Sequence, residues 1–424
     1  MEILIESGRL VNPPGGKEGM FDILIEDGVV VKIAKHIRRP AAKKIAAKGC
    51  LVLPGLVDCH CHLREPGRED EETIATGTRA AVRGGFTTIC CMANTEPPLD
   101  GKVPIRFIRD RAEKEGACEV LPIGAVTVGR QGAVIAPYGE MVEEGAVAFS
   151  DDGCCVMDSL VMRRALEYTR LFGKPVISHA EDQVLAKNGV MNEGFLSLRL
   201  GLSGIPRQAE EIMVARDISL AVLTGGRLHC AHLTTAEAVE LVRRAKRSVK
   251  TVTAEAAIHH CVLTEEAVRG YNAMAKVSPP LRTEKDIEAL CRGLKDGTID
   301  CLVTDHAPHT DEEKETGFEH APFGMIGFET ALPLAFSLRK RGLTLREIVG
   351  MLTSGPARVL GIGRGIVVEG GRADVVIVDP DRQWTYARET VISKSKNSPF
   401  IGKTLTGMVL VTIAAGKIVY TADR

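Results

Sequence analysis

The sequence predicts an α/β protein whose main part is a (β/α)8 barrel of the TIM type, accompanied by a small β-sandwich module built from both termini. Three observations lead to this prediction. Short apolar, β-branched runs alternate with longer segments of helical period through the middle of the chain. Glycine-punctuated β-rich runs recur at both ends. The length of 424 residues suits one barrel with an appendage.

The two ends of the chain are interpreted as one β module. Strands are expected at residues 2–5, 22–25, 29–33, 51–53, 373–379, 408–413 and 417–420. Asp27-Gly28 and Ala415-Gly416 separate apolar runs, as hairpin turns do. We therefore assign residues 1–53 plus 362–424 to the module and residues 54–361 to the catalytic barrel.

The middle of the chain supplies eight candidate barrel strands. They are expected at residues 56–59, 87–92, 120–125, 146–150, 175–178, 227–231, 251–254 and 301–304. Helical period is clearest at residues 73–84, 212–223 and 236–245. A doubly wound open sheet is the alternative. The strand count disfavours it, and so does the absence of a GxGxxG fingerprint at the start of the chain.

Composition excludes several classes of function. The formal net charge of −1 provides no broad field for nucleic acid or an anionic membrane. No run approaches the roughly 20 uncharged apolar residues of a membrane helix, and the acidic N-terminus differs from a secretory signal. The 12 cysteines are irregularly spaced and form no CxxC pair, as expected for small buried hydrophobes in a reducing compartment. We expect a cytoplasmic enzyme that binds neither nucleic acid nor membrane.

Metal-binding side chains follow five of the predicted strands, where a barrel carries its catalytic groups. In chain order they are His60, His62, Asp152, His179, His232 and Asp305. Each has a structural alternative, such as a satisfied polar histidine or a turn, but five such strand ends together favour a metal centre. Imidazole and carboxylate are good ligands for zinc, and six donors suit two ions rather than one tetrahedral ion.

The HxH segment of the first strand also allows a prediction of the face to which each side chain points. Because side chains alternate along a strand, His60 and His62 should face the same side, with Cys59 and Cys61 opposite them as buried filler. His229 is set aside from the metal set, since it faces away from its neighbours and lies one residue short of the strand end.

Several motifs resemble the amidohydrolase superfamily, and within it the bacterial dihydroorotases of class I type. Residues 54–62 resemble the PGxxDxHxH opening motif, while residues 62–67 (HLREPG), 92–95 (MANT) and 305–309 (DHAPH) resemble dihydroorotase. The resemblance runs over nearly the whole chain. It implies reversible, zinc-dependent hydrolysis of (S)-dihydroorotate to N-carbamoyl-L-aspartate, the third step of pyrimidine biosynthesis. It also implies a homodimer, with a complex with aspartate carbamoyltransferase as a further option.

The resemblance also assigns roles to the metal ligands. His60, His62 and Asp305 would hold one Zn2+, and His179 and His232 the other. Asp152, with hydroxide, would bridge the two ions in place of the carbamylated lysine of hydantoinases, allantoinases and some dihydroorotases. Asp305 would also be the catalytic base.

The same resemblance implies the substrate contacts. They are His62, Arg64 as the clamp for the substrate carboxylate, Asn94, Ser278, His309 and the main chain of Phe323 and Gly324. An ordinary rim ion pair is the alternative for Arg64. Ser278 replaces the asparagine of the family's KVNPPLR segment, and its hydroxyl reaches less far than the asparagine amide.

Three rival functions are weighed against this interpretation. They are a hydantoinase-like cyclic amidase, a noncatalytic dihydroorotase-like subunit and a phosphotriesterase-like barrel. Arg64 and the aspartate bridge disfavour the first, the complete ligand set disfavours the second, and the HLREPG and Asn94 signature disfavours the third.

Overall fold

Eight parallel strands form the ring that carries the predicted site residues in the computed structural model, which describes residues 2–422. They are β6 (Leu56–Cys61), β7 (Phe86–Cys91), β8 (Glu119–Gly124), β9 (Ala148–Phe149), β10 (Val176–Ser178), β13 (Leu228–Cys230), β14 (Val252–Ala257) and β15 (Cys301–Val303). Neighbours in this series are neighbours in the sheet. The segment after β15 closes the ring on β6: the Asp305 amide donates to the His60 carbonyl (3.1 Å) and the His62 amide to the His306 carbonyl (2.9 Å). The predicted barrel and its eight strands are confirmed.

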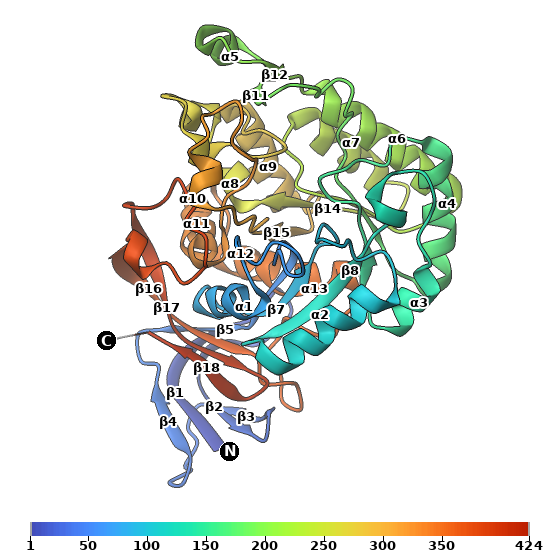
Figure 1. Cartoon of the computed structure of the whole chain (residues 1–424). Helices are drawn as coiled ribbons and strands as arrows, with labels where there is room; N and C mark the ends of the chain where they lie inside the picture. Colours follow the sequence, from blue (N-terminus) through green and yellow to red (C-terminus); the bar gives the residue numbers. More distant parts are fainter. Residues whose placement is uncertain (1, 423–424) are drawn as a thin grey trace.

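Helices lie outside this ring and bury its outer face (Figure 1). The longer ones are α1 (Ile74–Arg83), α2 (Lys102–Glu115), α4 (Ser159–Thr169), α6 (Gln208–Thr224), α7 (Ala236–Lys246) and α9 (Glu284–Asp296). The shorter ones are α3 (Tyr138–Glu143), α8 (Ile258–Val262), α10 (Asp311–Lys314), α11 (Ala331–Ser337), α12 (Leu345–Leu352) and α13 (Ser354–Leu360). A capping box at Thr73 begins α1, and the stripe Ile74, Gly77, Thr78 and Ala81 is buried against the barrel.

Both termini contribute to a second sheet, which lies below the barrel in Figure 1. Its path is β18 (Lys417–Thr421), β17 (Thr404–Ala414), β16 (Val375–Thr385), β5 (Leu51–Pro54), β1 (Glu2–Val11), β2 (Glu18–Glu26) and β3 (Val29–Ala34). An unpredicted strand, β4 (Lys43–Ala46), pairs with β1. The antiparallel pairing of β5 with β16 joins the two ends of the chain, and β5 continues through Gly55 into β6. This sheet therefore anchors the first strand of the barrel.

The two predicted hairpin turns of this sheet are present. Asp27 and Gly28 lie between β2 and β3 at φ 46° and 86°, and Ala415 and Gly416 lie between β17 and β18 at φ 48° and 75°. Positive φ at both central residues matches the twist of the flanking strands.

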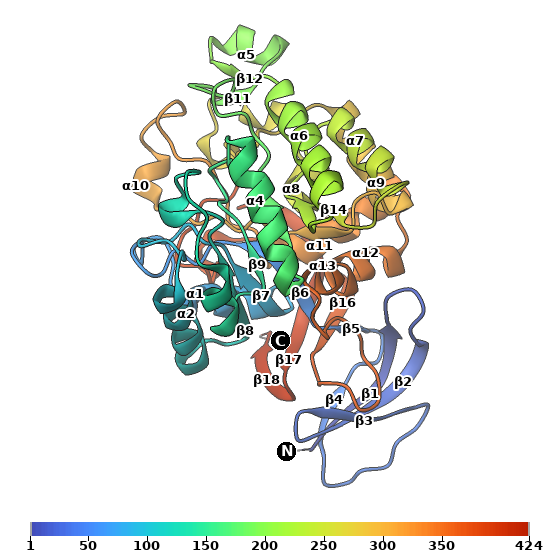
Figure 2. The ribbon, with the colours of Figure 1, turned by 90° about the vertical axis from the view of Figure 1, so that its right-hand side faces the viewer.

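One excursion projects from the barrel at the top of Figures 1 and 2. It contains the short pair β11 (Met191–Asn192) and β12 (Gly204–Ile205) with α5 (Phe195–Leu200) between them. The sequence did not predict this pair, because two-residue strands leave no periodic pattern. Across residues 2–422, no helix has the length and apolar character needed to cross a membrane.

Candidate metal centre and active site

The HxH segment at the end of β6 presents two imidazoles to the interior of the barrel mouth. His60 Nδ1 lies 2.5 Å from Glu255 Oε1, and His62 Nδ1 lies 2.8 Å from Asn94 Oδ1. These acceptors can each accept a hydrogen bond from Nδ1, which leaves Nε2 of the neutral ring free to bind a cation. Both Nε2 atoms face Asp305, whose Oδ1 is 3.7 Å from His60 and 3.2 Å from His62.

Asp152 lies between this group and a second pair of imidazoles. Its Oδ1 is 3.2 Å from His60 Nε2, and the same oxygen is 3.6 Å from both His179 Nδ1 and His232 Nε2. Its other oxygen, Oδ2, is 3.5 Å from His62 Nε2. Asp152 thus contacts donors of both predicted ligand groups, which is the arrangement that a bridging carboxylate requires.

Unsatisfied polar atoms at this point indicate that a cation fits. His60 Nε2 and Asp152 Oδ1 are fully buried, and although they lie 3.2 Å apart, neither forms a hydrogen bond of suitable geometry in the described part of the chain. Orphaned buried donors and acceptors are costly unless a ligand satisfies them. Two groups of ligand atoms, one of His60, His62 and Asp305 and one of His60, Asp152 and His232, are compact enough to hold an ion.

The electrostatics keep the acidic ligands ionised. Burial raises the pKa of Asp152, but the imidazoles of His60, His179 and His232 outweigh it and hold the pKa well below its usual range. The pKa of Asp305 is shifted in the same direction, because His62 and His60 outweigh its burial. Burial lowers the pKa of His179, yet the carboxylates of Asp152 and Glu181 raise it to about 10. The site therefore offers anionic oxygen donors, as a divalent cation requires.

Two buried aspartates hold the loops that carry these ligands. Asp58 accepts hydrogen bonds from the amides of His60 and Thr304, each at 3.2 Å, and so ties the end of β6 to the end of β15. Asp151 accepts from the amides of Val126 (2.8 Å) and Thr127 (3.1 Å), which fixes the loop of Asp152. Neither aspartate reaches the donor cluster, so both position ligands rather than bind metal.

Backbone strain also concentrates at the site. Arg64, His232 and Asp305 are three of the nine described non-glycine residues with positive φ, at 62°, 28° and 47°. Such conformations cost of order 1–3 kcal/mol each and persist where surrounding structure enforces them. Here the enforcing structure is the hydrogen bonding at the ends of β6, β13 and β15.

A cavity of about 450 Å3 opens above the donors. Eleven of the twelve predicted site residues line it, and His60 lies fully buried beneath it. Ser278 and Glu181 also line it. The structure thus brings the predicted residues together around one space large enough for a small ring.

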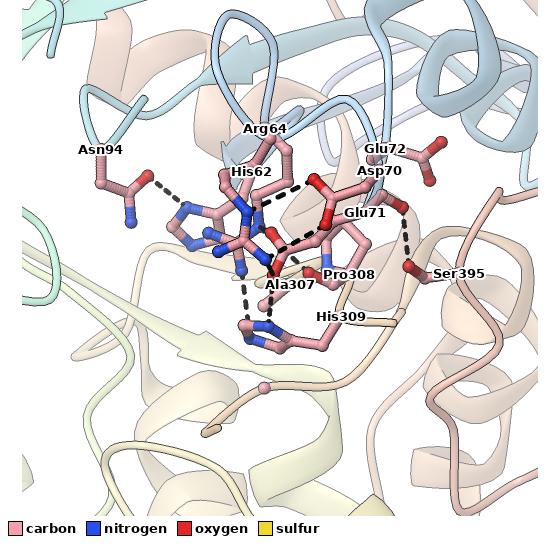
Figure 3. A network of polar contacts seen from close by, with 12 residues as sticks. His62, Arg64, Asp70, Glu71, Glu72, Asn94, Ala307, Pro308, His309 and Ser395 are labelled. Carbon is pink, nitrogen blue, oxygen red and sulfur yellow. Dashed lines mark hydrogen bonds and ion pairs between the residues drawn. The ribbon is translucent and has the colours of Figure 1, made fainter. Parts of the chain in front are cut away.

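Arg64 reaches this cavity from within a network of polar contacts (Figure 3). Its Nε lies 2.9 Å from Glu71 Oε2 and donates to the Pro308 carbonyl at 3.1 Å. Its Nη2 lies 3.3 Å from His309 Nε2, and His309 Nδ1 lies 2.7 Å from Glu71 Oε1. Arg64 therefore forms the ion pair that was its structural alternative and also lines the cavity, with the plane of its guanidinium fixed.

Another part of the cavity lining comes from the loop at Phe323 and Gly324. The carbonyl oxygen of Phe323 lies 2.8 Å from His309 Nε2, which places the main chain beside the Arg64 network. Gly324 has φ 135°, and a Cβ there would lie only 2.7 Å from the Cβ of Ala307. Only glycine lets this loop approach the DHAPH segment so closely.

Comparison with known proteins agrees with this geometry. Residues 49–238 match the family described as "Dihydro-orotase-like". A relative from Trichlorobacter lovleyi named "Dihydroorotase" is 48% identical over 423 residues, covering 99% of this chain and 100% of the relative. A second, from Pelotomaculum thermopropionicum, carries the same name and is 50% identical over 421 residues, with coverages of 99% and 98%. The chain belongs to the dihydroorotase family.

Solved structures extend the likeness to the fold. The L-hydantoinase (dihydropyrimidinase) from Arthrobacter aurescens superposes with a TM-score of 0.89 at 25% identity, covering 100% of this chain and 96% of that one. The hydantoinases thus share the whole architecture, whereas the relatives of twice that identity are dihydroorotases. Membership of the dihydroorotase family therefore rests on the sequence relatives, because the fold is shared with hydantoinases.

One prediction for this dihydroorotase-family chain is wrong. Cys59 and Cys61 do not share a face: Cys59 packs with Cys90 and Cys301 inside the barrel, whereas Cys61 packs with Leu63 and the helix-facing core. The cause is an irregularity in the pairing of β6 with β7 between Asp58 and Cys61, which breaks the strict alternation of side chains.

Sequence reasoning missed three acidic residues of the site. Glu255 lies one residue beyond the predicted strand at 251–254, because β14 continues to Ala257. Glu71 belongs to an acidic run that is typical of a solvated surface, yet it is buried. Glu181 lies two residues after His179 and faces its Nε2 at 3.9 Å. A polar residue just after a metal-binding histidine was the only available signal for the last of these.

Proposed function

We propose that this chain is a dihydroorotase, which interconverts (S)-dihydroorotate and N-carbamoyl-L-aspartate in pyrimidine biosynthesis. The observation that carries the proposal is a cavity lined by five metal-type residues, with His60 buried beneath it, and by the guanidinium of Arg64. The donors suit hydrolysis of a ring amide, and Arg64 suits the single carboxylate of this ring. Family membership supports the same conclusion.

We further propose that the cavity holds two Zn2+ ions. His60, His62 and Asp305 would bind one ion, His179 and His232 the other, and Asp152 both. When bound, such ions polarise a carbonyl and supply a water-derived nucleophile near neutral pH. The orphaned atoms His60 Nε2 and Asp152 Oδ1 support this assignment.

The protein's own groups then orient the substrate and move the proton. Arg64 pairs with the substrate carboxylate, assisted by Asn94 and His309, while the main chain of Phe323 and Gly324 contacts the ring. Ser278 can donate or accept at the ring edge, although it reaches less far than the asparagine it replaces. Each of these residues lines the cavity.

Asp305 is the proposed general base. Its carboxylate is ionised, lies 3.2 Å from His62 Nε2 and projects into the cavity from the end of β15. In the hydrolytic direction it accepts a proton from the nucleophile and delivers it to the leaving ring nitrogen.

The test is the ultraviolet absorbance decay of L-dihydroorotate with zinc-loaded enzyme, beside hydantoin and dihydrouracil. Turnover of dihydroorotate alone is the expected result. Turnover of only the uncharged rings would be consistent with metal-dependent hydrolysis and would contradict dihydroorotate as the substrate. Absence of any turnover calls for the same assay with aspartate carbamoyltransferase present, and inactivity there too would reject the proposal.

Assembly and organisation complete the proposal. We infer a cytoplasmic homodimer, able to associate with aspartate carbamoyltransferase, in which residues 54–361 form the catalytic domain and residues 1–53 plus 362–424 the β module. Light scattering of the purified protein, alone and with the carbamoyltransferase, measures both associations. A monomer that does not bind the carbamoyltransferase would contradict the proposed assembly and leave the proposed activity unaffected.

A further inference from the structure

A second group of metal-type side chains lies inside the barrel, one layer below the candidate active site. It consists of Cys59, His229, Glu255 and Cys301, and we call it the lower cluster. All four are fully buried, at 0% exposure. They come from β6, β13, β14 and β15, so the cluster is set by the barrel itself and not by loops.

The strand register places these groups face to face. Glu255 and Cys301 are direct partners in the pairing of β14 with β15. His229 is the partner of Thr253, two residues before Glu255 and on the same face of β14. Cys59 completes the group, because the irregularity of β6 turns it into the barrel.

The distances within the lower cluster are close to those of a four-coordinate site, and the hydrogen-bonded pair of Glu255 and His229 is the shortest. The two sulfur atoms, Cys59 Sγ and Cys301 Sγ, are 3.8 Å apart. Glu255 Oε2 lies 3.3 Å from Cys59 Sγ and 2.9 Å from His229 Nε2, and all four ligand atoms lie within 4.8 Å of one another. Tetrahedral zinc with sulfur at about 2.3 Å and nitrogen or oxygen at about 2.0 Å separates its ligand atoms by roughly 3.3–3.8 Å.

The surroundings also match those of a metal site. The other ring nitrogen of His229, Nδ1, lies 2.8 Å from Thr253 Oγ1, so it can donate there while Nε2 binds a cation. Glu255 uses Oε1 for His60 and Oε2 for the lower cluster. It can therefore bind a cation and hold His60 at the same time.

We propose that the lower cluster is a closed site for a thiophilic divalent cation of the zinc class, with two cysteines, one histidine and one glutamate as its four ligands. The cation replaces the contacts that Glu255 Oε2 makes with Cys59 and His229, and both cysteines bind as thiolates. Two thiolates and a carboxylate leave the site with one excess negative charge, which the cations proposed above it offset. Through Glu255 the site fixes His60, so its role is to brace the catalytic centre.

The test exploits sulfur, which the proposed catalytic ligand set lacks. The protein is expressed in zinc-supplemented and, separately, cobalt-supplemented medium, so that the fully buried site fills during folding. Zinc X-ray absorption should show sulfur scatterers at about 2.3 Å, and the cobalt protein a near-ultraviolet thiolate-to-cobalt band. Total metal should approach three ions per chain.

Matched serine variants assign the signal. Cys59→Ser and Cys301→Ser should each lose the sulfur signal and one metal ion per chain. Cys61→Ser is the control, since Cys61 is equally buried on the same strand but faces the helices. It should keep both signals, and circular dichroism checks that each variant folds.

Other outcomes overturn the proposal. Wild-type protein without zinc–sulfur scattering and without the cobalt band would show that the lower cluster is only a hydrogen-bonded network. A band that disappears equally in Cys61→Ser would place the sulfur ligand elsewhere. Because these readouts do not use activity, an inactive enzyme with a full lower cluster would reject the proposed function and keep this inference.

Discussion

Replacing Arg64 tests whether the buried guanidinium selects the substrate carboxylate. Arg64→Met keeps much of the side-chain volume and removes the charge. A charge-assisted hydrogen bond contributes about 1.5–3 kcal/mol, and a guanidinium can make two to one carboxylate. Loss of roughly 3–5 kcal/mol corresponds to a decrease of about 10²- to 10⁴-fold in kcat/KM.

The structure supplies the control for this variant. Arg68 also pairs with Glu71, at 3.3 Å, but is partly exposed and does not line the cavity. Arg68→Met should therefore reproduce the disturbance of Glu71 without the loss of substrate affinity, and kcat/KM should stay within a few-fold of wild type. Arg64→Lys should fall between them, because it keeps the charge and loses the planar fork.

The assay compares L-dihydroorotate with its uncharged methyl ester. If Arg64 binds the carboxylate, Arg64→Met lowers kcat/KM for dihydroorotate by the predicted factor and leaves the ester within about threefold. Equal losses on both compounds would mean that Arg64 acts only through the ion pair with Glu71, which was its structural alternative. Retention of dihydroorotate activity would refute the clamp outright.

Three further predictions follow from the contacts of the site. Asp305→Ala should abolish turnover while zinc analysis still finds metal, and near-normal activity would exclude Asp305 as the base. Glu255→Gln should weaken zinc binding at the active site by about 10- to 100-fold in chelator competition, because His60 Nδ1 loses a charged partner; unchanged affinity would refute that role. Burial, with the charge of Lys276, lowers the pKa of Lys314 from 10.5 to about 7. Between pH 7 and pH 10.5 the folded state therefore binds fewer protons than the unfolded state. The free energy of unfolding should rise from pH 7 towards pH 10.5, and denaturant titrations should find a shallower rise in Lys314→Met.

The barrel could be predicted from sequence because its strands are marked by composition and spacing. Fully buried parallel strands form continuous apolar runs, and the metal-type residues fall where those runs end. The four-residue β4 at Lys43–Ala46 was missed because two lysines followed by two apolar residues form too short a run to show the alternation of a strand. Its pairing with β1 depends on tertiary contact rather than on local preference.

Side-chain direction was harder to predict than position. Strict alternation gave the common face of His60 and His62 and failed for Cys59, since one irregular pairing shifts the face of a residue without changing the sequence pattern. The same error concealed the lower cluster. Glu255 and Glu71 could not be predicted for a different reason. Their roles depend on contacts with His60, 195 positions away, and with Arg64, 7 positions away, and neither contact is marked by a sequence motif.

These hidden partners explain how the site holds six ligands from five strands in register. Residues from other strands fix the ligands of β6: Glu255 of β14 holds the His60 ring, and Asp58 ties the backbone of β6 to that of β15. A shift of one strand would therefore move ligands of both proposed ions together. If the lower cluster binds a cation, it links β6, β13, β14 and β15 at one point directly beneath His60. The rigidity of the metal centre is then a property of the barrel interior, and substitutions there should change metal affinity even where they do not touch the cavity.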